Sequence, residues 1–230
     1  MIDVNEILSS LASKRPIFHS EADFQHALAW EIHSKWLECS MRLEYRPPRL
    51  EERIYLDIWA AGKDAILAIE LKYKTRLLYI KTEGETFELA DQAAQDLARY
   101  DFLKDIQRLE RTISHIQNAV GYALFLTNDS AYWKSPMVLG TVDESFRIHQ
   151  GKVITGELRW GSKASQGTTR TREKSITIKG WYKLNWQDYS EPSDDSYGKF
   201  RYLSVRIDRA PSSKEEHMAR RVTMCSLGCS

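Results

Sequence analysis

Cysteine is scarce in this chain of 230 residues, where only Cys39, Cys225 and Cys229 occur. Three thiols cannot build the disulfide framework of a small secreted protein, so a reducing cytoplasm is the expected location. Cys225 and Cys229, with His217 upstream, do not have the spacing of a standard zinc site and lack a fourth ligand. They fall in a polar tail, residues 211–230, which we expect to be a surface segment or partly disordered.

Long apolar runs, phosphate-binding glycine loops and a strong net charge are also missing from the sequence. No apolar run approaches the length of a transmembrane helix and the first residues do not follow a signal-peptide pattern, so we expect no membrane association. Without a glycine loop or a G-x-S-x-G elbow, nucleoside-triphosphate hydrolysis and serine hydrolase chemistry have no support. The formal net charge is +1, so affinity for nucleic acid would have to come from local basic patches.

Two segments in the first third of the chain predict a β-hairpin. Residues 53–59 alternate between apolar and polar side chains, and residues 65–72 are apolar until their last positions. Gly62, with polar residues after it, suits a tight turn between the two strands. We place Gly62 and Lys63 at the centre of this turn, which defines the pairing of the strands.

That pairing brings three charged side chains to one face of the hairpin. Asp57 lies opposite Ala68, and Glu70 is its diagonal neighbour at roughly 7–8 Å between Cα atoms. Because side chains two residues apart point the same way, Asp57, Glu70 and Lys72 share a face, while the apolar side chains collect on the other. The turn and the hydrophobic pattern therefore agree on the arrangement.

Asp57 and Glu70 are candidate ligands of a divalent cation, Mg²⁺ or Mn²⁺. Mg²⁺ prefers oxygen ligands and usually takes only one or two protein carboxylates together with substrate phosphate oxygens. Lys72 could orient the attacking water, stabilise a charged transition state, or act as a base if its pKa were lowered. The simpler alternative is an exposed ion pair between Glu70 and Lys72, which would stabilise the fold little.

Asp57 followed by the triplet Glu70-Leu71-Lys72 resembles the PD-(D/E)XK nuclease superfamily, although Leu56 stands where many members have Pro. The resemblance covers roughly residues 18–130 and rests on these three motif residues. It implies a restriction-endonuclease-like α/β fold, with a mixed central sheet flanked by helices. It also implies a Mg²⁺-dependent endonuclease that hydrolyses phosphodiester bonds, with DNA as the favoured substrate and Asp57, Glu70 and Lys72 as catalytic residues.

Members of this family often supply a third acidic ligand from the first helix of the core. Glu21 is our candidate here, and Glu31 is the alternative on the same helix. Glu21 lies one residue after Ser20, a predicted N-cap, so it could equally favour the helix N-terminus through the helix dipole.

The remaining elements fit the same fold class. Helical spacing predicts helices over residues 20–37 and 89–116, and short apolar segments predict strands over 42–46 and 121–127. From Phe146 onward, short alternating strands separated by glycine predict a β-rich C-terminal extension, with segments at 146–148, 152–154, 157–160, 175–178 and 200–207. We expect a nuclease-like core at 1–140, an extension of the same domain at 141–210, and the polar tail beyond.

Two groups of side chains are candidates for nucleic-acid binding. Lys74, Arg76 and Gln92 follow the catalytic strand, with a Lys-, Thr- and Glu-rich segment, 77–88, that we expect to be a loop lining the site. The basic segment 159–179 could grip a phosphate backbone, with its candidate contacts at Arg170, Arg172 and Lys174. Solvated polar surface is the competing explanation for Gln92 and for the basic segment.

The nuclease interpretation is favoured over two others. The first is a nucleic-acid-binding or protein-interaction module that keeps the fold without catalysis, and retention of Asp57, Glu70 and Lys72 argues against it. The second is a glycosidase with paired carboxylates, which gives no reason for Lys72. The expected partner is nucleic acid, with a homodimer or a larger defence or repair assembly as possible organisation.

Overall fold

The computed structural model describes residues 3–47, 54–82 and 84–209. The helices are α1 (Val4–Lys14), α2 (Glu21–Lys35), α3 (Gln95–Ile113) and the short α4 (Gln166–Thr169), with a 3-10 turn η1 at Glu144–Phe146. The strands are β1 (Ser40–Tyr45), β2 (Leu56–Ala61), β3 (Ile66–Lys74), β4 (Leu78–Thr82), β5 (Glu85–Leu89), β6 (Ala119–Thr127), β7 (Val153–Leu158), β8 (Ile176–Lys183), β9 (Trp186–Ser190) and β10 (Phe200–Asp208). In the part of the chain described, no helix is both long and apolar enough to cross a membrane.

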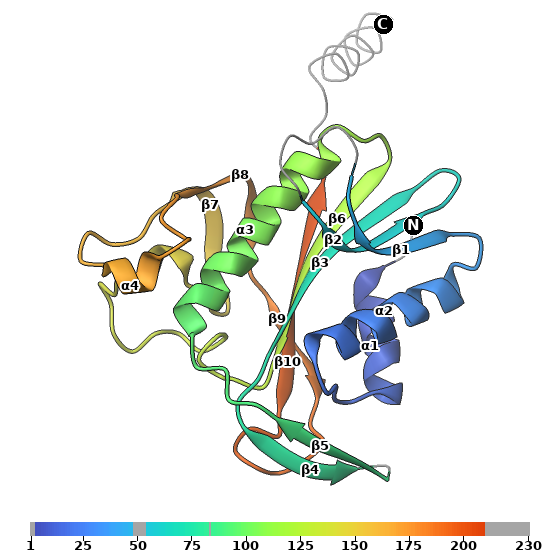
Figure 1. Ribbon diagram of the computed structural model, residues 1–230, viewed down its shortest axis with the longest axis horizontal. Helices are drawn as coiled ribbons and strands as arrows, with labels where there is room; N and C mark the ends of the chain where they lie inside the picture. Colours follow the sequence, from blue (N-terminus) through green and yellow to red (C-terminus); the bar gives the residue numbers. More distant parts are fainter. Residues whose placement is uncertain (1–2, 48–53, 83, 210–230) are drawn as a thin grey trace, which may run out of the picture.

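A six-stranded mixed sheet forms the centre of the protein (Figure 1). Its strand order is β1-β2-β3-β6-β10-β9, in which only β3 and β6 pair in parallel. The connection between these two parallel strands runs through α3, as a crossover connection requires. The predicted class, an α/β protein with a mixed sheet flanked by helices, is confirmed.

The sheet separates two hydrophobic cores. The helices α1 and α2 pack on one face, against alternate side chains of β3 such as Leu67, Ile69 and Leu71. The helix α3 covers the other face, where Ala68 and Phe125 belong to the core. Figure 1 shows α3 and the α1–α2 pair on opposite sides of the strands. Residues 68, 70 and 72 of β3 therefore point toward α3, because side chains alternate along a strand.

The hairpin of β2 and β3 forms where predicted, but its register is shifted by two residues. Ala61 pairs with Ile66, not with Asp64, and the turn is longer because the Gly62 N–H donates to the carbonyl of Ala65. Ala68 consequently lies opposite Trp59 and not opposite Asp57. A shift of two residues preserves the alternation along β3, so Glu70 and Lys72 stay on the predicted face. The alternation of β2 breaks at Asp57, because Leu56 belongs to the core on the α3 side and Ile58 to the core on the other side.

The helix predicted at 89–116 begins later, at Gln95. The segment 77–88, predicted to be a loop, instead contains most of a separate hairpin formed by β4 and β5. Alternation explains this, since Leu78, Ile80, Phe87 and Leu89 are buried among exposed polar neighbours. The first predicted helix is right, with Ser20 accepting a hydrogen bond from the Asp23 N–H as its N-cap.

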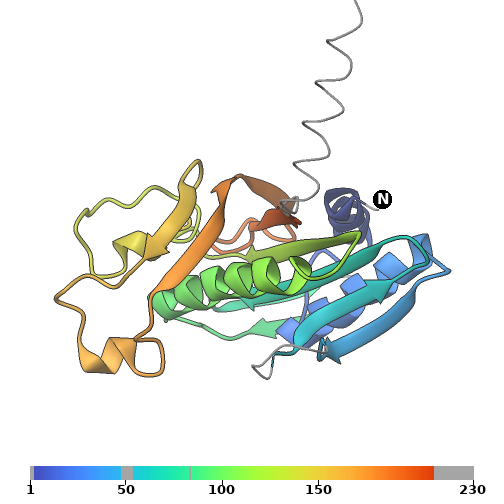
Figure 2. The same ribbon diagram turned by 90° about the horizontal axis from the view of Figure 1, so that it is seen from above.

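The second half contributes to two sheets. The strands β9 and β10 extend the central sheet, whereas β7 and β8 form a pair that packs on α3. In Figure 2 this pair and α4 lie at one end of the molecule and the α1–α2 pair at the other. The strand predicted at 146–148 is wrong, because Phe146 ends η1 and is buried against Tyr100 and Trp160. The tail at 211–230, with Cys225 and Cys229, lies outside the described residues.

Candidate active site

Asp57 and Glu70 face each other across neighbouring strands. The last pair of the β2–β3 ladder is Ile58–Ile69, and Asp57 and Glu70 are the next residue on each strand. The Asp57 carboxylate is near enough to raise the pKa of Glu70. The Asp57 carboxylate accepts a hydrogen bond from the Leu71 N–H at 2.6 Å, and the Asp57 carbonyl accepts one from the Gln25 amide at 2.7 Å. These two bonds tie Asp57 to the neighbouring strand β3 and to α2.

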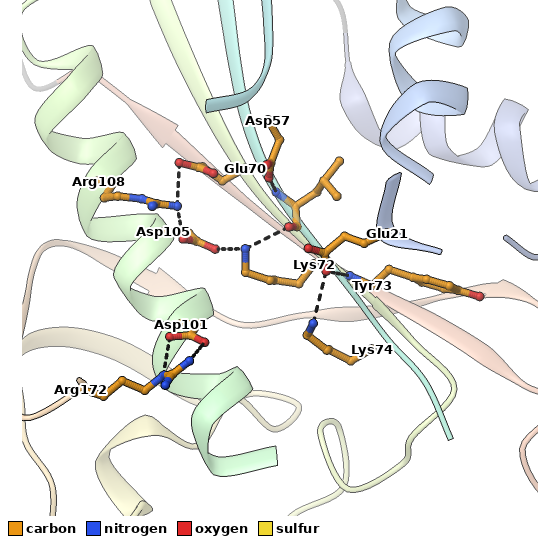
Figure 3. A network of polar contacts seen from close by, with 11 residues as sticks. Glu21, Asp57, Glu70, Lys72, Tyr73, Lys74, Asp101, Asp105, Arg108 and Arg172 are labelled. Carbon is orange, nitrogen blue, oxygen red and sulfur yellow. Dashed lines mark hydrogen bonds and ion pairs between the residues drawn. The ribbon is translucent and has the colours of Figure 1, made fainter. Parts of the chain in front are cut away.

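Two residues of α3 complete the charged group (Figure 3). The Lys72 ammonium lies 2.8 Å from Oδ2 of Asp105, and Nη2 of Arg108 lies 2.9 Å from Oε1 of Glu70. The same Nη2 also contacts the other oxygen of Asp105. Glu70, Arg108, Asp105 and Lys72 thus form a continuous chain of alternating charges between β3 and α3, which we call the β3–α3 network.

Burial raises the pKa values of all three carboxyl groups of the site. The pKa of Asp57 rises to about 6, even though the Leu71 N–H and the Lys72 ammonium favour its ionised form. For Glu70, burial and the nearby Asp105 carboxylate raise the pKa well above its ordinary value against the attraction of Arg108. Asp105 is also buried, and its pKa is raised although Lys72 and Arg108 lower it in part.

Lys72 remains a cation in this environment. Burial alone would lower its pKa, but the Asp105 carboxylate more than offsets this and the pKa ends above its ordinary value. The pKa of Arg108 is also raised, because Asp105 and Glu70 outweigh the effect of burial. A lowered pKa, which a base role for Lys72 would need, is therefore not what this environment produces; its charge points to an electrostatic role.

The two candidate third acids lie in different surroundings. Glu21, at the start of α2, accepts a hydrogen bond from the Tyr73 N–H at 2.8 Å and lies 3.4 Å from Nζ of Lys74. Its charge is near enough to raise the pKa of Asp57. Glu31 instead faces α1, where it pairs with Lys14 at 2.7 Å and accepts a hydrogen bond from Ser10. Of the two, Glu21 is the one beside the site.

The oxygen atoms present suit a hard cation such as Mg²⁺. Within the described residues, no three His, Cys, Asp or Glu side chains are already arranged to hold a metal ion. Mg²⁺ needs fewer protein ligands than that, since it keeps several waters. Two carboxylate oxygens, Oε1 of Glu70 and Oδ2 of Asp105, are buried and have no aligned hydrogen-bond donor among the described residues, only the adjacent cations. Asp57 and Glu70 would be the first ligands.

A cavity of about 290 Å³ lies at the beginning of α3. None of the four network residues lines it, but Lys74 follows Lys72 on β3 and Asp101 precedes Asp105 by about one turn of α3. Three of the predicted nucleic-acid contacts, Lys74, Gln92 and Arg172, line it together with Asp101 and Leu97. The structure therefore brings together residues from both predicted groups. Arg172 is held there by two hydrogen bonds to Asp101, at 2.8 and 2.7 Å (Figure 3).

The other predicted contacts are placed differently. Arg76 pairs with Asp91 and stacks over the ring of Tyr197, so its charge already has internal partners. Arg170 and Lys174 are exposed on the segment that carries Arg172, outside the residues that line the cavity. A larger cavity of about 380 Å³ lies beside the turn of the β2–β3 hairpin and contains none of the site residues.

Sequence reasoning missed Asp105 and Arg108. A signal for Asp105 was present: Ala98, Phe102, Asp105 and Leu109 follow helical spacing, so the aspartate interrupts an otherwise apolar stripe. A carboxylate on a buried stripe needs a partner. Arg108, one turn later, is that partner.

Comparisons with family models, with curated proteins and with solved structures found no match for the chain. The nuclease interpretation therefore depends on the residues of the site and their geometry.

Proposed function

We propose that the protein is a metal-dependent nuclease of the restriction-endonuclease-like type, which hydrolyses phosphodiester bonds and takes DNA as its preferred substrate. The observation that carries this proposal is the common face of Asp57, Glu70 and Lys72 on two paired strands. The arrangement costs stability, because burial raises the pKa of both carboxyl groups. Strongly perturbed carboxyl groups beside a cation are more frequent at functional sites than elsewhere.

Each residue has a defined part in the proposed reaction. In hydrolysis, a water oxygen bonds to phosphorus, and the bond from phosphorus to one ester oxygen breaks. The attacking water gives up one proton and the departing oxygen gains one, so the protons balance with Lys72 remaining protonated. Asp57 and Glu70 would hold Mg²⁺, which when bound polarises the phosphoryl group and offsets its developing negative charge. Lys72 keeps its proton and stabilises the same charge from two residues beyond Glu70, on the same face of β3.

The adjoining cavity supports a nucleic-acid substrate. It is lined by two cationic side chains, Lys74 and Arg172, by Asp101, which pairs with Arg172, and by the amide of Gln92. Cations position a phosphate backbone, and an amide can contact base or sugar. These groups begin two residues beyond Lys72 on β3, so a strand bound in the cavity would pass the catalytic carboxylates.

The test is nicking of supercoiled plasmid with Mg²⁺, Mn²⁺ or EDTA. We expect metal-dependent cleavage by the wild type and its loss in Asp57→Asn and Lys72→Met. Asp64→Asn and Lys63→Met are matched controls, because both side chains are exposed in the turn of the same hairpin and should leave cleavage unchanged. Cleavage that persists in EDTA, or in both site variants, would contradict the proposal.

A second candidate, a nucleic-acid-binding module without catalysis, is favoured by one observation. Every charge of the β3–α3 network already has a partner within the protein, as in a purely structural polar cluster. Plasmid binding without cleavage in any metal, and without binding of Mn²⁺, would favour this candidate over the nuclease.

A further inference from the structure

Arg108 occupies a position between two acidic side chains that suits a bound cation. One nitrogen, Nη2, lies 2.9 Å from Oε1 of Glu70 and also contacts Oδ1 of Asp105. Both carboxylates are nearly inaccessible to solvent, with 1% of the Glu70 side chain and 5% of the Asp105 side chain exposed. The guanidinium is therefore the counter-ion that allows two acids to share a buried space.

We propose that Arg108 and a divalent metal ion compete for these carboxylates, and that Asp105 becomes the third acidic ligand of the site once Arg108 has withdrawn. This inference rests on the proposed function, because it concerns the same metal site. It assigns α3 a direct part in metal binding that the strand residues alone do not suggest.

Distance and charge make the two cations mutually exclusive. Mg²⁺ binds oxygen at about 2.0–2.1 Å, closer than the 2.9 Å contact between Arg108 and Glu70. An ion between Glu70 and Asp105 would thus overlap the space that Nη2 fills. A guanidinium in contact with the same oxygens would also repel the ion, and this repulsion is strong where water is excluded.

Arg108 is the more exposed of the two cations of the network. Its side chain is 26% exposed, compared with 16% for Lys72, which favours withdrawal of Arg108 over that of Lys72. Lys72 also donates a hydrogen bond to the Leu71 carbonyl at 3.2 Å and can stay beside Asp105. Withdrawal of Arg108 would leave the buried oxygen of Glu70, which has no aligned donor now, free to bind metal.

The competition predicts opposite effects for two neighbouring residues of α3. If Arg108 fills the site most of the time, only a small fraction of molecules can bind metal. The apparent metal affinity is then the affinity of those molecules multiplied by their fraction. Arg108→Gln should then tighten Mn²⁺ binding by about tenfold or more. Asp105→Asn should weaken it by about tenfold, as expected when one ligand is lost. Lys104→Gln, an exposed charge on the same helix, should leave it within about twofold because surface charges are screened.

The experiment is titration of the EDTA-treated full chain with Mn²⁺, following free Mn²⁺ by electron paramagnetic resonance and unfolding by circular dichroism. Arg108→Gln leaves two buried carboxylates with less compensation, so Arg108→Lys serves as a second variant in case the first does not fold. It keeps the charge on a shorter side chain without the planar fork, and its affinity should lie between those of wild type and Arg108→Gln.

Opposite shifts for Arg108→Gln and Asp105→Asn would support the competition, since a merely structural role predicts weaker or unchanged binding in both. A different outcome is that wild type binds Mn²⁺ and Asp57→Asn does not, while neither Arg108→Gln nor Asp105→Asn changes the affinity in the expected direction. The inference is then wrong and the proposed metal site stands. If wild type and the Arg108 variants bind no Mn²⁺ at all, both the inference and the metal-dependent function are wrong.

Discussion

Replacement of Asp57 by Asn should make the metal-free protein more stable at pH 8. Burial raises the pKa of Asp57 from 3.8 to about 6, so ionisation of this group opposes folding. Two pKa units correspond to about 3 kcal/mol, an upper limit for the gain when the charge is removed. The Asn side chain keeps an oxygen that can accept the Leu71 N–H, so the hydrogen bond at this position is retained.

The gain should depend on pH in a defined direction. Between pH 4 and 6 the folded state binds more protons at Asp57 than the unfolded state, so the wild type loses stability as the pH rises through this window. The advantage of Asp57→Asn should therefore be largest above pH 6 and fall below about 1 kcal/mol at pH 4.

The measurement is urea denaturation of both proteins in EDTA at pH 8 and pH 4, with Asp64→Asn as the exposed control from the same hairpin. A variant that is less stable than the wild type at pH 8 would refute the reasoning. So would a difference that is the same at both pH values, because it could not arise from ionisation of Asp57.

Three further predictions concern the surroundings of the site. Glu31→Gln should lower the free energy of unfolding in urea by about 1–3 kcal/mol, because it weakens the pairing with Lys14 between α1 and α2. Plasmid cleavage should be unchanged, and its loss in a folded variant would return Glu31 to the site. Arg172→Ala should weaken DNA binding and lower the slope of affinity against salt by about one, whereas an unchanged slope would remove Arg172 from the phosphate contacts. Gly62→Ala should lower the free energy of unfolding by about 1–3 kcal/mol, because the added Cβ would lie 2.2 Å from the Trp36 ring. An unchanged free energy of unfolding would show that the ring moves freely.

The central strands and the charged face of the hairpin were predictable from the sequence. Segments such as β6 are continuous apolar runs, which are typical of strands buried on both faces. Glu70 and Lys72 reach one face in either register, since the observed pairing differs by two residues. The break in alternation at Asp57, which sends Leu56 to the core opposite to that of Ile58, was not predicted. The length of the turn is what the sequence did not reveal, because Gly62 is compatible with both turns.

The contribution of α3 to the site was not predictable to the same degree. Periodicity identifies a buried face of the helix, but the partner of that face depends on how the helix docks on the sheet. The position of Asp105 on an apolar stripe indicates that it is buried, but only the docking of α3 shows that Lys72 and Glu70 are the partners of Asp105 and Arg108. The β4–β5 hairpin was missed because its many polar residues concealed a short alternation.

The strand order of the central sheet has a consequence for synthesis of the chain. One edge of β6 pairs with β3, which is made earlier, but the other edge pairs with β10, which begins only at Phe200. During translation, more than seventy residues after β6 must be synthesised before β10 can cover this edge of its nine apolar or small residues. An open, apolar strand edge is a template for aggregation. Chains that stop before β10 should therefore aggregate, and ribosome-bound chains of that length should be clients of chaperones that shield exposed strands.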